Sequence, residues 1–371
     1  MSQPQLEIQL VALVVAAACA LPGVFLVLRR LAMLSDAISH AILPGIVVGF
    51  FLTDDLNAPL LIVAAAATGV LTVVLVELLN RTRLVKEDAA IGLVFPALFS
   101  LGVLLIARYA DDVHLDTDAV LLGELAFAYL DRFEVAGLDL GPKALITGGV
   151  ALLLNATFIA LFYKELKLST FDARLAATLG FAPTVLHYAQ MTLVSVTAVV
   201  SFDAVGSVLV IALMIGPAAT AYLLTDRLDR MLYLSVGIAV LGALLGYNLA
   251  RVLDASIAGS MAACIGLVFG LTYLLAPERG LLAIWQRRRT QRWHFATKML
   301  TIHLQQHEGE PEQDRECHVG HLQEHFRWQA SFADRVVQQA QTNGFVQRQG
   351  DALHLTEAGR LLANEAVVNR R

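Results

Sequence analysis

Stretches of about 20 apolar residues recur along most of this chain, and this feature constrains its fold more than any other. Each stretch is long enough to cross the hydrocarbon core of a bilayer. Of the 371 residues, 57% are hydrophobic and 16% are charged. We therefore expect a polytopic membrane protein. No Lys or Arg precedes the first stretch, so it is predicted to be a span and not a signal peptide.

The apolar stretches predict an all-α membrane domain with eight or nine transmembrane helices. The expected spans are residues 8–28, 36–52, 59–79, 89–108, 143–163, 184–201, 205–224, 230–249 and 257–276. The segment 36–52 is short for a span, which leaves the choice between eight and nine open. A further piece near 119–130 is predicted to be amphipathic or re-entrant.

Basic residues between the spans predict the orientation. Lys and Arg at 81–86, 164–174 and 227–230 mark three loops as cytoplasmic under the positive-inside rule. Arg29 and Arg30, after the first span, then place the N-terminus outside. The acidic segment Asp111–Asp118 is expected on the outer side, either as an attractor of cations or as an ordinary solvated loop.

Two ionisable residues lie inside an apolar segment, in the sequence LSDAISHAILPG. Asp36 and His40 are four residues apart, so on a helix they share one face. An ionisable group inside a span is costly and usually faces a polar path or partner. One carboxylate and one imidazole together suit Mn(II), Fe(II) or Zn(II). The alternative is structural: Asp36 caps the helix and His40 bonds a neighbouring carbonyl.

The same segment resembles a motif of the permease subunits of bacterial zinc and manganese ABC importers. Segments from Glu87 to Ile106, Leu121 to Phe127, Ser201 to Leu224 and Ala276 to Gly280 resemble family segments in the same order. The resemblance covers about residues 8–280. It implies that Asp36 and His40 lie on the path of a transported metal, with no permanently bound cofactor. Glu124 and Asp203 are secondary candidates for that path; capping or solvent exposure is the alternative for both.

Residues 164–183 look like the cytoplasmic coupling loop of these permeases. Ser169 or Thr170 is expected to cap a short helix. The residues expected to contact an ATPase are Phe171, Asp172, Leu175, Leu179 and Gly180. The chain has no GxxxxGK[ST] phosphate loop, so ATP hydrolysis is expected on a separate subunit. The alternative is that 164–183 is an ordinary surface connector.

Beyond a basic juxtamembrane linker at 281–292, residues 293–371 are predicted to form a small soluble α+β domain. Two short strands around Gly350 and Asp351, followed by a helix capped by Thr356, give the order of a winged helix. The segment resembles the winged-helix domain of repressors of the diphtheria-toxin-repressor type. Residues 277–371 carry 13 Lys and Arg against 11 Asp and Glu. Such a small surplus favours a structural or regulatory role over DNA binding.

Seven of the ten histidines lie in this tail, and two groups have helical spacing. One group is His303 with His307; the other is His318 with His321 and His325. Imidazoles at this spacing can bind a metal ion, which predicts a cytoplasmic sensor that slows import. The alternative is a set of exposed histidines on polar helices.

These observations predict the permease subunit of an ABC importer for manganese, zinc or iron in the bacterial cytoplasmic membrane, with a cytoplasmic C-terminal domain. The resemblance implies three partners: a separate ATPase, an extracytoplasmic metal-binding lipoprotein, and a second copy or a related permease. Two alternatives stay open at this point. One is a secondary transporter, and the other is a membrane-tethered, metal-responsive transcription regulator that uses the winged helix.

Overall fold

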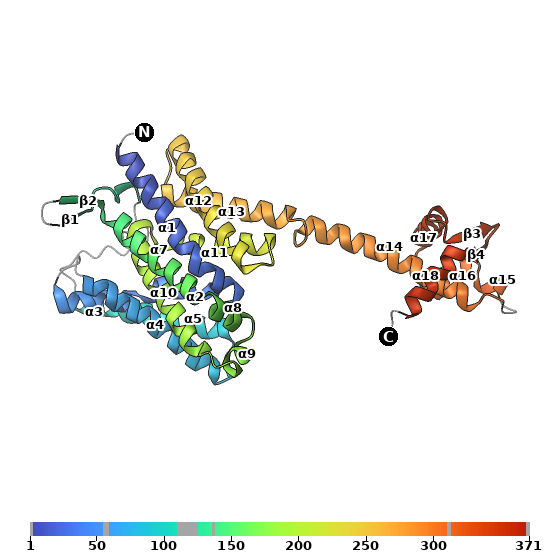
Figure 1. Cartoon of the computed structure of the whole chain (residues 1–371), viewed down its shortest axis with the longest axis horizontal. Helices are drawn as coiled ribbons and strands as arrows, with labels where there is room; N and C mark the ends of the chain where they lie inside the picture. The colour runs from blue at the N-terminus through green and yellow to red at the C-terminus, as the bar shows by residue number, and fades with distance from the viewer. Residues whose placement is uncertain (1–2, 55–58, 110–124, 136–137, 310–312, 369–371) are drawn as a thin grey trace. The chain divides into compact units, whose positions relative to one another are not determined.

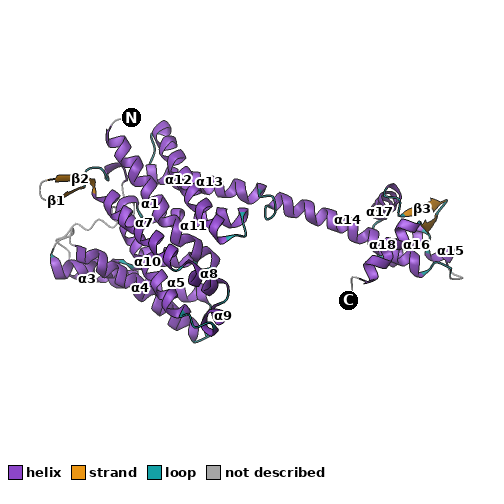
Figure 2. Cartoon of the chain, in the orientation of Figure 1, coloured by secondary structure: helices purple, strands orange, loops and turns teal. Residues whose placement is uncertain are grey.

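The computed structural model describes residues 3–54, 59–109, 125–135, 138–309 and 313–368. The chain divides into two compact units, Met1–Gly280 and Leu281–Arg371. Helices dominate both units (Figure 2).

Unit 1 is a bundle of helices with one small β-hairpin (Figure 1). Its helices are α1 (Gln3–Leu28), α2 (Ala32–Ala41), α3 (Leu43–Thr53), α4 (Pro59–Arg81), α5 (Glu87–Tyr109), α7 (Lys143–Leu161), α8 (Tyr163–Phe171), α9 (Ala173–Thr178), α10 (Pro183–Val205), α11 (Ser207–Leu224), α12 (Leu228–Leu253) and α13 (Ile257–Leu275). A 3-10 turn, η1 (Leu125–Phe127), precedes strands β1 (Arg132–Val135) and β2 (Leu138–Pro142).

Within the described residues, nine helical segments are long and apolar enough to cross a membrane. The segment 36–52, which the sequence left undecided as a span, belongs to one of them. Helices α2 and α3 together form a candidate span of 22 residues, Ala32–Thr53. Its predicted length was too short because the first turn of α2 precedes Asp36. The prediction of an all-α membrane domain with up to nine spans is confirmed in this respect.

Helix α1 lies at the centre of the bundle, in contact with α7, α10, α11 and α12. Small residues at 16–20 are fully or almost fully buried, and they allow neighbouring backbones to approach closely. At Gly23 an added Cβ would lie 1.9 Å from the carbonyl oxygen of Met214 in α11. Asn155 of α7 donates hydrogen bonds to the Ala18 carbonyl and to Thr197 Oγ1 of α10. One buried amide thus joins three helices.

The expectation of an amphipathic or re-entrant helix near 119–130 needs correction. Residues 119–124 lie outside the described part of the chain, and the part that is described contains only the short turn η1. It is followed by the antiparallel hairpin β1–β2, with an irregular register between Arg132 and Glu134. Two strands of four and five residues give too short an alternation to be separated from a loop in the sequence.

Unit 2 combines helices with a two-stranded antiparallel sheet. Its elements are α14 (Leu281–Gln306), α15 (Gln313–Glu316), α16 (Val319–His325), α17 (Ala330–Thr342), β3 (Val346–Gln349), β4 (Ala352–Leu355) and α18 (Glu357–Val368). In the sheet, Val346 pairs with Leu355 and Gln349 with Ala352. Leu300, Leu322 and Leu353 lie in a core of their own.

The predicted turn at Gly350 and the capped last helix are confirmed. Thr356 Oγ1 accepts a hydrogen bond from the Gly359 amide at 3.1 Å, as a helix N-cap does. Residues 281–292, predicted to be a linker, instead form the first half of the continuous helix α14. Helices with a small sheet are therefore established for unit 2, whereas its assignment as a winged helix stays a prediction.

Candidate functional site: the intramembrane Asp–His pair and its cytoplasmic surroundings

Asp36 and His40 lie on one face of α2, as the sequence predicts. His40 Nε2 is 3.4 Å from Asp36 Oδ1, across one helical turn. The helix begins after Leu31, and no side chain caps its N-terminus. The alternative in which Asp36 acts as a cap is therefore wrong, because the carboxylate is directed to the imidazole.

Aromatic and small polar residues surround this pair. The His40 ring lies 6.0 Å from the ring of Phe95 and 6.5 Å, edge on, from the ring of Phe99, both on α5. On α2 itself, Ser35 and Ser39 are buried and donate their hydroxyl hydrogens to carbonyls of the same helix. These hydroxyls are already bonded, so the carboxylate and the imidazole are the groups of α2 best placed to bind a ligand.

The break between α2 and α3 follows the pair directly. Pro44 lies in the first turn of α3, where its missing N–H leaves no intrahelical bond unmade. At Gly45 an added Cβ would lie 2.5 Å from the carbonyl oxygen of Ala64 on α4. Only a residue without a side chain allows this contact. The LPG sequence therefore holds the start of α3 tightly against α4.

The pair is partly exposed in the single chain. The side chains are 39% exposed for Asp36 and 29% for His40. The carboxylate oxygen and the imidazole nitrogen are 3.4 Å apart, which is about the separation of two ligand atoms in a tetrahedral site with bonds of about 2.1 Å. The pair is therefore a suitable start for a site that binds a first-row divalent ion. Further ligands would have to come from another chain, from water or from the ion's carrier.

Of the other two candidates in the membrane unit, Asp203 lies within the described residues and is not in contact with this pair. Glu124 lies outside the described residues. Asp203 is exposed near the C-terminal end of α10 and takes no part in the contact between Asp36 and His40.

The loop between α7 and α10 forms two short helices, α8 and α9. Asp172 caps α9, since its Oδ1 accepts a hydrogen bond from the Leu175 amide at 2.9 Å. The predicted cap at Ser169 or Thr170 is therefore wrong. Phe171, Leu175 and Leu179 are 63%, 46% and 60% exposed, respectively. We call these three residues the coupling surface.

Gly180 ends this short segment. Its φ of +87° is in the left-handed region, which residues with a side chain rarely adopt. The Phe181 amide then donates to the Ala176 carbonyl, which closes the helix end.

Arg29 contacts the other side of this loop, a relationship the sequence did not reveal. Its guanidinium donates to the hydroxyls of Ser169 and Thr170 and lies 2.8 Å from His187 Nδ1 of α10. These partners are about 140 to 160 residues away in sequence, so no local pattern signals the contact.

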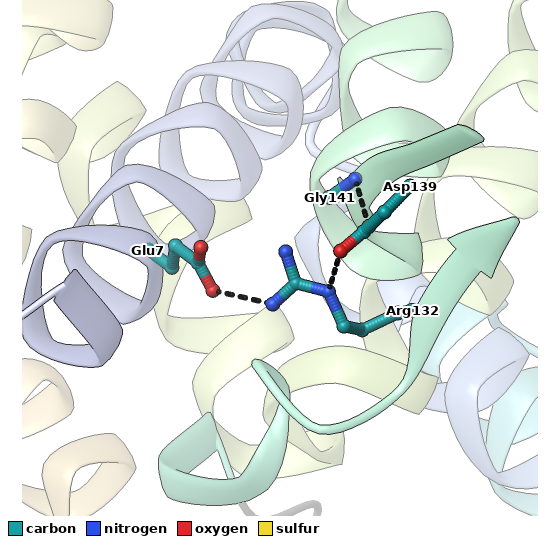
Figure 3. A network of polar contacts seen from close by, with 4 residues as sticks. All are labelled: Glu7, Arg132, Asp139 and Gly141. Atoms are coloured by element: carbon teal, nitrogen blue, oxygen red, sulfur yellow. Dashed lines mark hydrogen bonds and ion pairs between the residues drawn. The ribbon is translucent and has the colours of Figure 1, made fainter.

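A second network ties the hairpin to the start of α1 (Figure 3). Arg132 donates to Asp139 Oδ2 at 2.6 Å and to Glu7 Oε2 at 3.1 Å. The Gly141 amide also donates to Asp139, and these two donors hold the pKa of the Asp139 carboxyl below its usual value. Glu7 lies at the end of α1 that is opposite Arg29 and Arg30, so this network marks the predicted outer side.

The tail histidines are regrouped by the fold of unit 2. His303 of α14 and His307, which follows the end of that helix, have ring centroids 4.8 Å apart. The His303 ring lies 4.7 Å from that of His325 and 6.2 Å from that of His321, both on α16. His318 is separate from them and lies 3.8 Å from Asp351. Glu316, which the sequence did not single out, joins this group through His321.

Comparisons with known proteins agree with this architecture. The chain is 48% identical over 358 residues to the zinc transport system membrane protein TroD of Treponema pallidum (strain Nichols), covering 96% of this chain and 97% of that protein. It is 47% identical over 268 residues to the manganese transport system membrane protein MntD of Bacillus subtilis (strain 168), covering 72% and 90%. The alignment with TroD exceeds the 280 residues of unit 1 and so extends into unit 2.

The fold also matches a solved structure, PsaBC from Streptococcus pneumoniae in complex with Fab. The TM-score is 0.64 at 25% sequence identity, over 76% of this chain and 96% of that chain. These relatives give no support to a membrane-tethered transcription regulator. Residues 5–276, almost all of unit 1, match the family described as the ABC 3 transport family, and the chain belongs to that family.

Proposed function

We propose that this chain is the permease subunit of an ATP-binding-cassette importer that moves a divalent transition metal ion across the bacterial cytoplasmic membrane. The observation that carries the proposal is the contact between Asp36 and His40 inside a candidate span. The names of TroD and MntD, zinc and manganese transport proteins, support the choice of metal class. Iron(II) suits the same two donor types and stays in the test.

The partial exposure of the pair supports a position on the transport path. A carboxylate facing lipid near the centre of a span costs roughly 2.5–3.5 kcal/mol. Asp36 and His40 avoid that cost if a second permease, a copy or a related chain, covers them and the two chains share one central polar path. The second chain would then supply the missing ligands.

The chain itself is not an enzyme, and a separate ATPase provides the energy. Three large apolar side chains on short helices, exposed on the side that carries the basic loops, are a surface suited to a docked protein. We assign ATPase docking to the coupling surface, with Asp172 and Gly180 fixing its shape. The lack of a phosphate loop in the sequence supports this division of labour.

The nine candidate spans support an N-terminus outside and a tail in the cytoplasm. An odd number of spans places the two ends on opposite sides, and the basic loops fix which side is cytoplasmic. An extracytoplasmic metal-binding lipoprotein would deliver the ion to the face that carries Glu7 and the hairpin. Asp203 and Glu124 are assigned at most a secondary role near that entrance.

We further propose three functional parts: a permease domain at 1–280, a basic juxtamembrane stretch at 281–292, and a winged-helix-like domain at 293–371. The helices, the hairpin β3–β4 and the capped α18 support the last assignment. A regulatory or structural role fits the tail better than binding of nucleic acid, because its charge is almost balanced.

The test is uptake of radiolabelled Mn, Zn or Fe(II) by proteoliposomes that contain this chain with its ATPase, loaded through the binding protein. Asp36→Asn and His40→Gln keep size and polarity but weaken ligation. We expect each to abolish ATP-dependent uptake while the complex still assembles on size-exclusion chromatography. Competition among the three ions in the wild type identifies the metal.

Asp88→Asn is the matched control, because Asp88 is exposed at the start of α5 on the cytoplasmic side. It should transport as the wild type does. Full uptake by both Asp36→Asn and His40→Gln would remove the pair from the path. Uptake that survives without ATP but fails on collapse of the proton gradient would instead indicate a secondary transporter.

A further inference from the structure

A compact cluster of nitrogen and oxygen donors lies in unit 2, in a part of the chain that the transport path does not use. One ring nitrogen of His303, one of His321 and a carboxylate oxygen of Glu316 all lie within 4.8 Å of one another. The ligand atoms of a tetrahedral zinc ion, with bonds of about 2.1 Å, are about 3.4 Å apart. Shifts of about 1 Å therefore suffice to close these donors around one ion.

His303 is already held in the form that a metal ligand needs. Its Nε2 lies 3.1 Å from the Glu316 carbonyl oxygen. A carbonyl only accepts, so Nε2 carries the hydrogen and Nδ1 carries the lone pair. A backbone carbonyl that fixes the tautomer in this way is the usual second contact of a metal-bound histidine. The residue is only 4% exposed, so its ring is held in this orientation by the packing around it.

The contact between His321 and Glu316 points to a shared cation. His321 Nε2 lies 2.6 Å from Glu316 Oε2, but this nitrogen is buried and lacks a hydrogen-bond partner of acceptable geometry within the described residues. A ring nitrogen and a carboxylate oxygen this close need either an aligned N–H between them or a cation beside both. A metal ion satisfies both groups at once.

A fourth donor is available beside these three. The exposed His325 follows His321 by one helical turn, with ring centroids 5.6 Å apart, and lies 4.7 Å from His303. Imidazoles with one carboxylate form a donor set that suits Zn²⁺. We propose that His303, Glu316 and His321, completed by His325, form a cytoplasmic binding site for Zn²⁺ or a similar divalent transition metal ion.

Such an ion would fix the local fold of unit 2. His303 lies near the end of α14, Glu316 ends α15, and His321 and His325 lie on α16. A bound ion would therefore fasten α14, α15 and α16 to one another. Because the tail is proposed to lie in the cytoplasm, the site would sample the metal content of the compartment into which the ion is imported. The site itself does not depend on that proposal.

The three tryptophans of the chain make the site measurable in the intact protein. Trp285, Trp293 and Trp328 all lie in unit 2, and none lies in the unit that carries Asp36 and His40. Trp328 stacks on Phe326 at 4.7 Å, and Phe326 lies 5.2 Å from His303. Zn²⁺ added to the chelator-treated, full-length chain in detergent should change the emission saturably, with one ion per chain. Co²⁺ should produce the visible absorption bands of a four-coordinate site.

Two partly buried ligands provide the principal variants, His321→Gln and Glu316→Gln. Each should lower the affinity for Zn²⁺ by at least about tenfold, because even the loss of a residue that only supports a metal ligand lowers metal affinity by that much. Each must show the wild-type emission maximum in chelator, which establishes that unit 2 is folded. His325→Gln changes an exposed residue and provides a further variant that leaves the core intact. His318→Gln is the matched control, since His318 faces Asp351.

We expect His318→Gln to retain the Zn²⁺ response and the Co²⁺ bands. We expect His321→Gln and Glu316→Gln to lose both. Wild-type titrations in both ligand variants, or an equal loss in His318→Gln, would overturn the site. Failure of the transport proposal is separately visible, because Asp36→Asn should leave the emission response unchanged whether or not it abolishes uptake.

Discussion

Arg29 Nη1 lies 2.8 Å from His187 Nδ1, and this contact joins the end of the central helix α1 to the start of α10. A guanidinium only donates, so Nδ1 accepts and the His187 ring is neutral. The same guanidinium donates to Ser169 and Thr170 at the end of α8. One cation therefore connects the core of the membrane unit with the loop that carries the coupling surface. We infer that it transmits movement of that loop to the bundle.

Replacing Arg29 should uncouple ATP hydrolysis from transport. Arg29→Met removes every donor and leaves two hydroxyls and a ring nitrogen in a half-buried place, which costs about 1–3 kcal/mol for each unmade bond to a buried group. We expect a lower unfolding temperature and a fall in metal ions imported per ATP hydrolysed. Uptake and phosphate release measured in the same proteoliposomes give this ratio.

Arg30→Met is the control for this change, because the neighbouring Arg30 is exposed. It should retain both the unfolding temperature and the coupling ratio. Arg29→Lys keeps the charge but cannot donate in three directions at fixed angles, so it should give an intermediate ratio. A normal ratio in Arg29→Met would remove Arg29 from the coupling mechanism.

Two glycines should respond in opposite ways to the same substitution. Gly23→Ala forces a methyl group against the Met214 carbonyl, where a Cβ would lie at 1.9 Å, and rigid backbone cannot yield cheaply. Overpacking of this kind costs about 1–3 kcal/mol or more. At Gly149 on α7 an added Cβ has no neighbour within 4 Å, so Gly149→Ala should gain up to about 1 kcal/mol of helix propensity. In detergent, the unfolding temperature should be lower than that of the wild type for Gly23→Ala and higher for Gly149→Ala.

Contacts within one helix could be predicted from the sequence, because helical geometry alone brings residues four apart together. Asp36 and His40 are the clear case. The prediction of the cap of α9 was wrong, although a cap is a local feature. Ser169, Thr170 and Asp172 all have side chains suited to capping, and only the tertiary contacts with Arg29 decide among them. Propensity allows all three residues as caps, but the prediction named only the two that bond to Arg29 and not Asp172, which caps the helix.

Contacts between helices could not be read in the same way. The tail histidines were grouped by spacing, yet the fold joins His303 to His321 and His325 and leaves His318 apart. Glu316 was missed because nothing in the neighbouring sequence marks it, and only the contact of α15 with α16 brings its carboxylate to His321. The hairpin β1–β2 was missed for a similar reason, since side chains distant in sequence hold it to α1.

The network of Figure 3 should persist in mild acid. Hydrogen bonds from Gly141 and Arg132 lower the pKa of Asp139 from its usual 3.8. A carboxyl whose folded pKa is lowered contributes stability above its unfolded value, and this is lost only as the pH falls through the folded value. Hydrogen exchange of the hairpin, corrected for the intrinsic rate, should thus be equal at pH 7 and pH 5. Arg132→Gln should raise it at both; exchange that rises at pH 5 in the wild type would contradict the assignment.

The coupling surface makes the sharpest prediction about assembly. Leu179 is 60% exposed and ends the stripe that begins at Phe171, so Leu179→Asp would bury an unpaired charge if an ATPase covers it. The complex should no longer copurify with its ATPase. Leu84 is 88% exposed in another basic loop on the same side and provides the control, Leu84→Asp. Loss of ATPase binding in Leu179→Asp alone would assign docking to the coupling surface. Equal loss in both variants would mean that the ATPase contact is not specific to the coupling surface. Normal copurification of both variants would refute docking at the coupling surface.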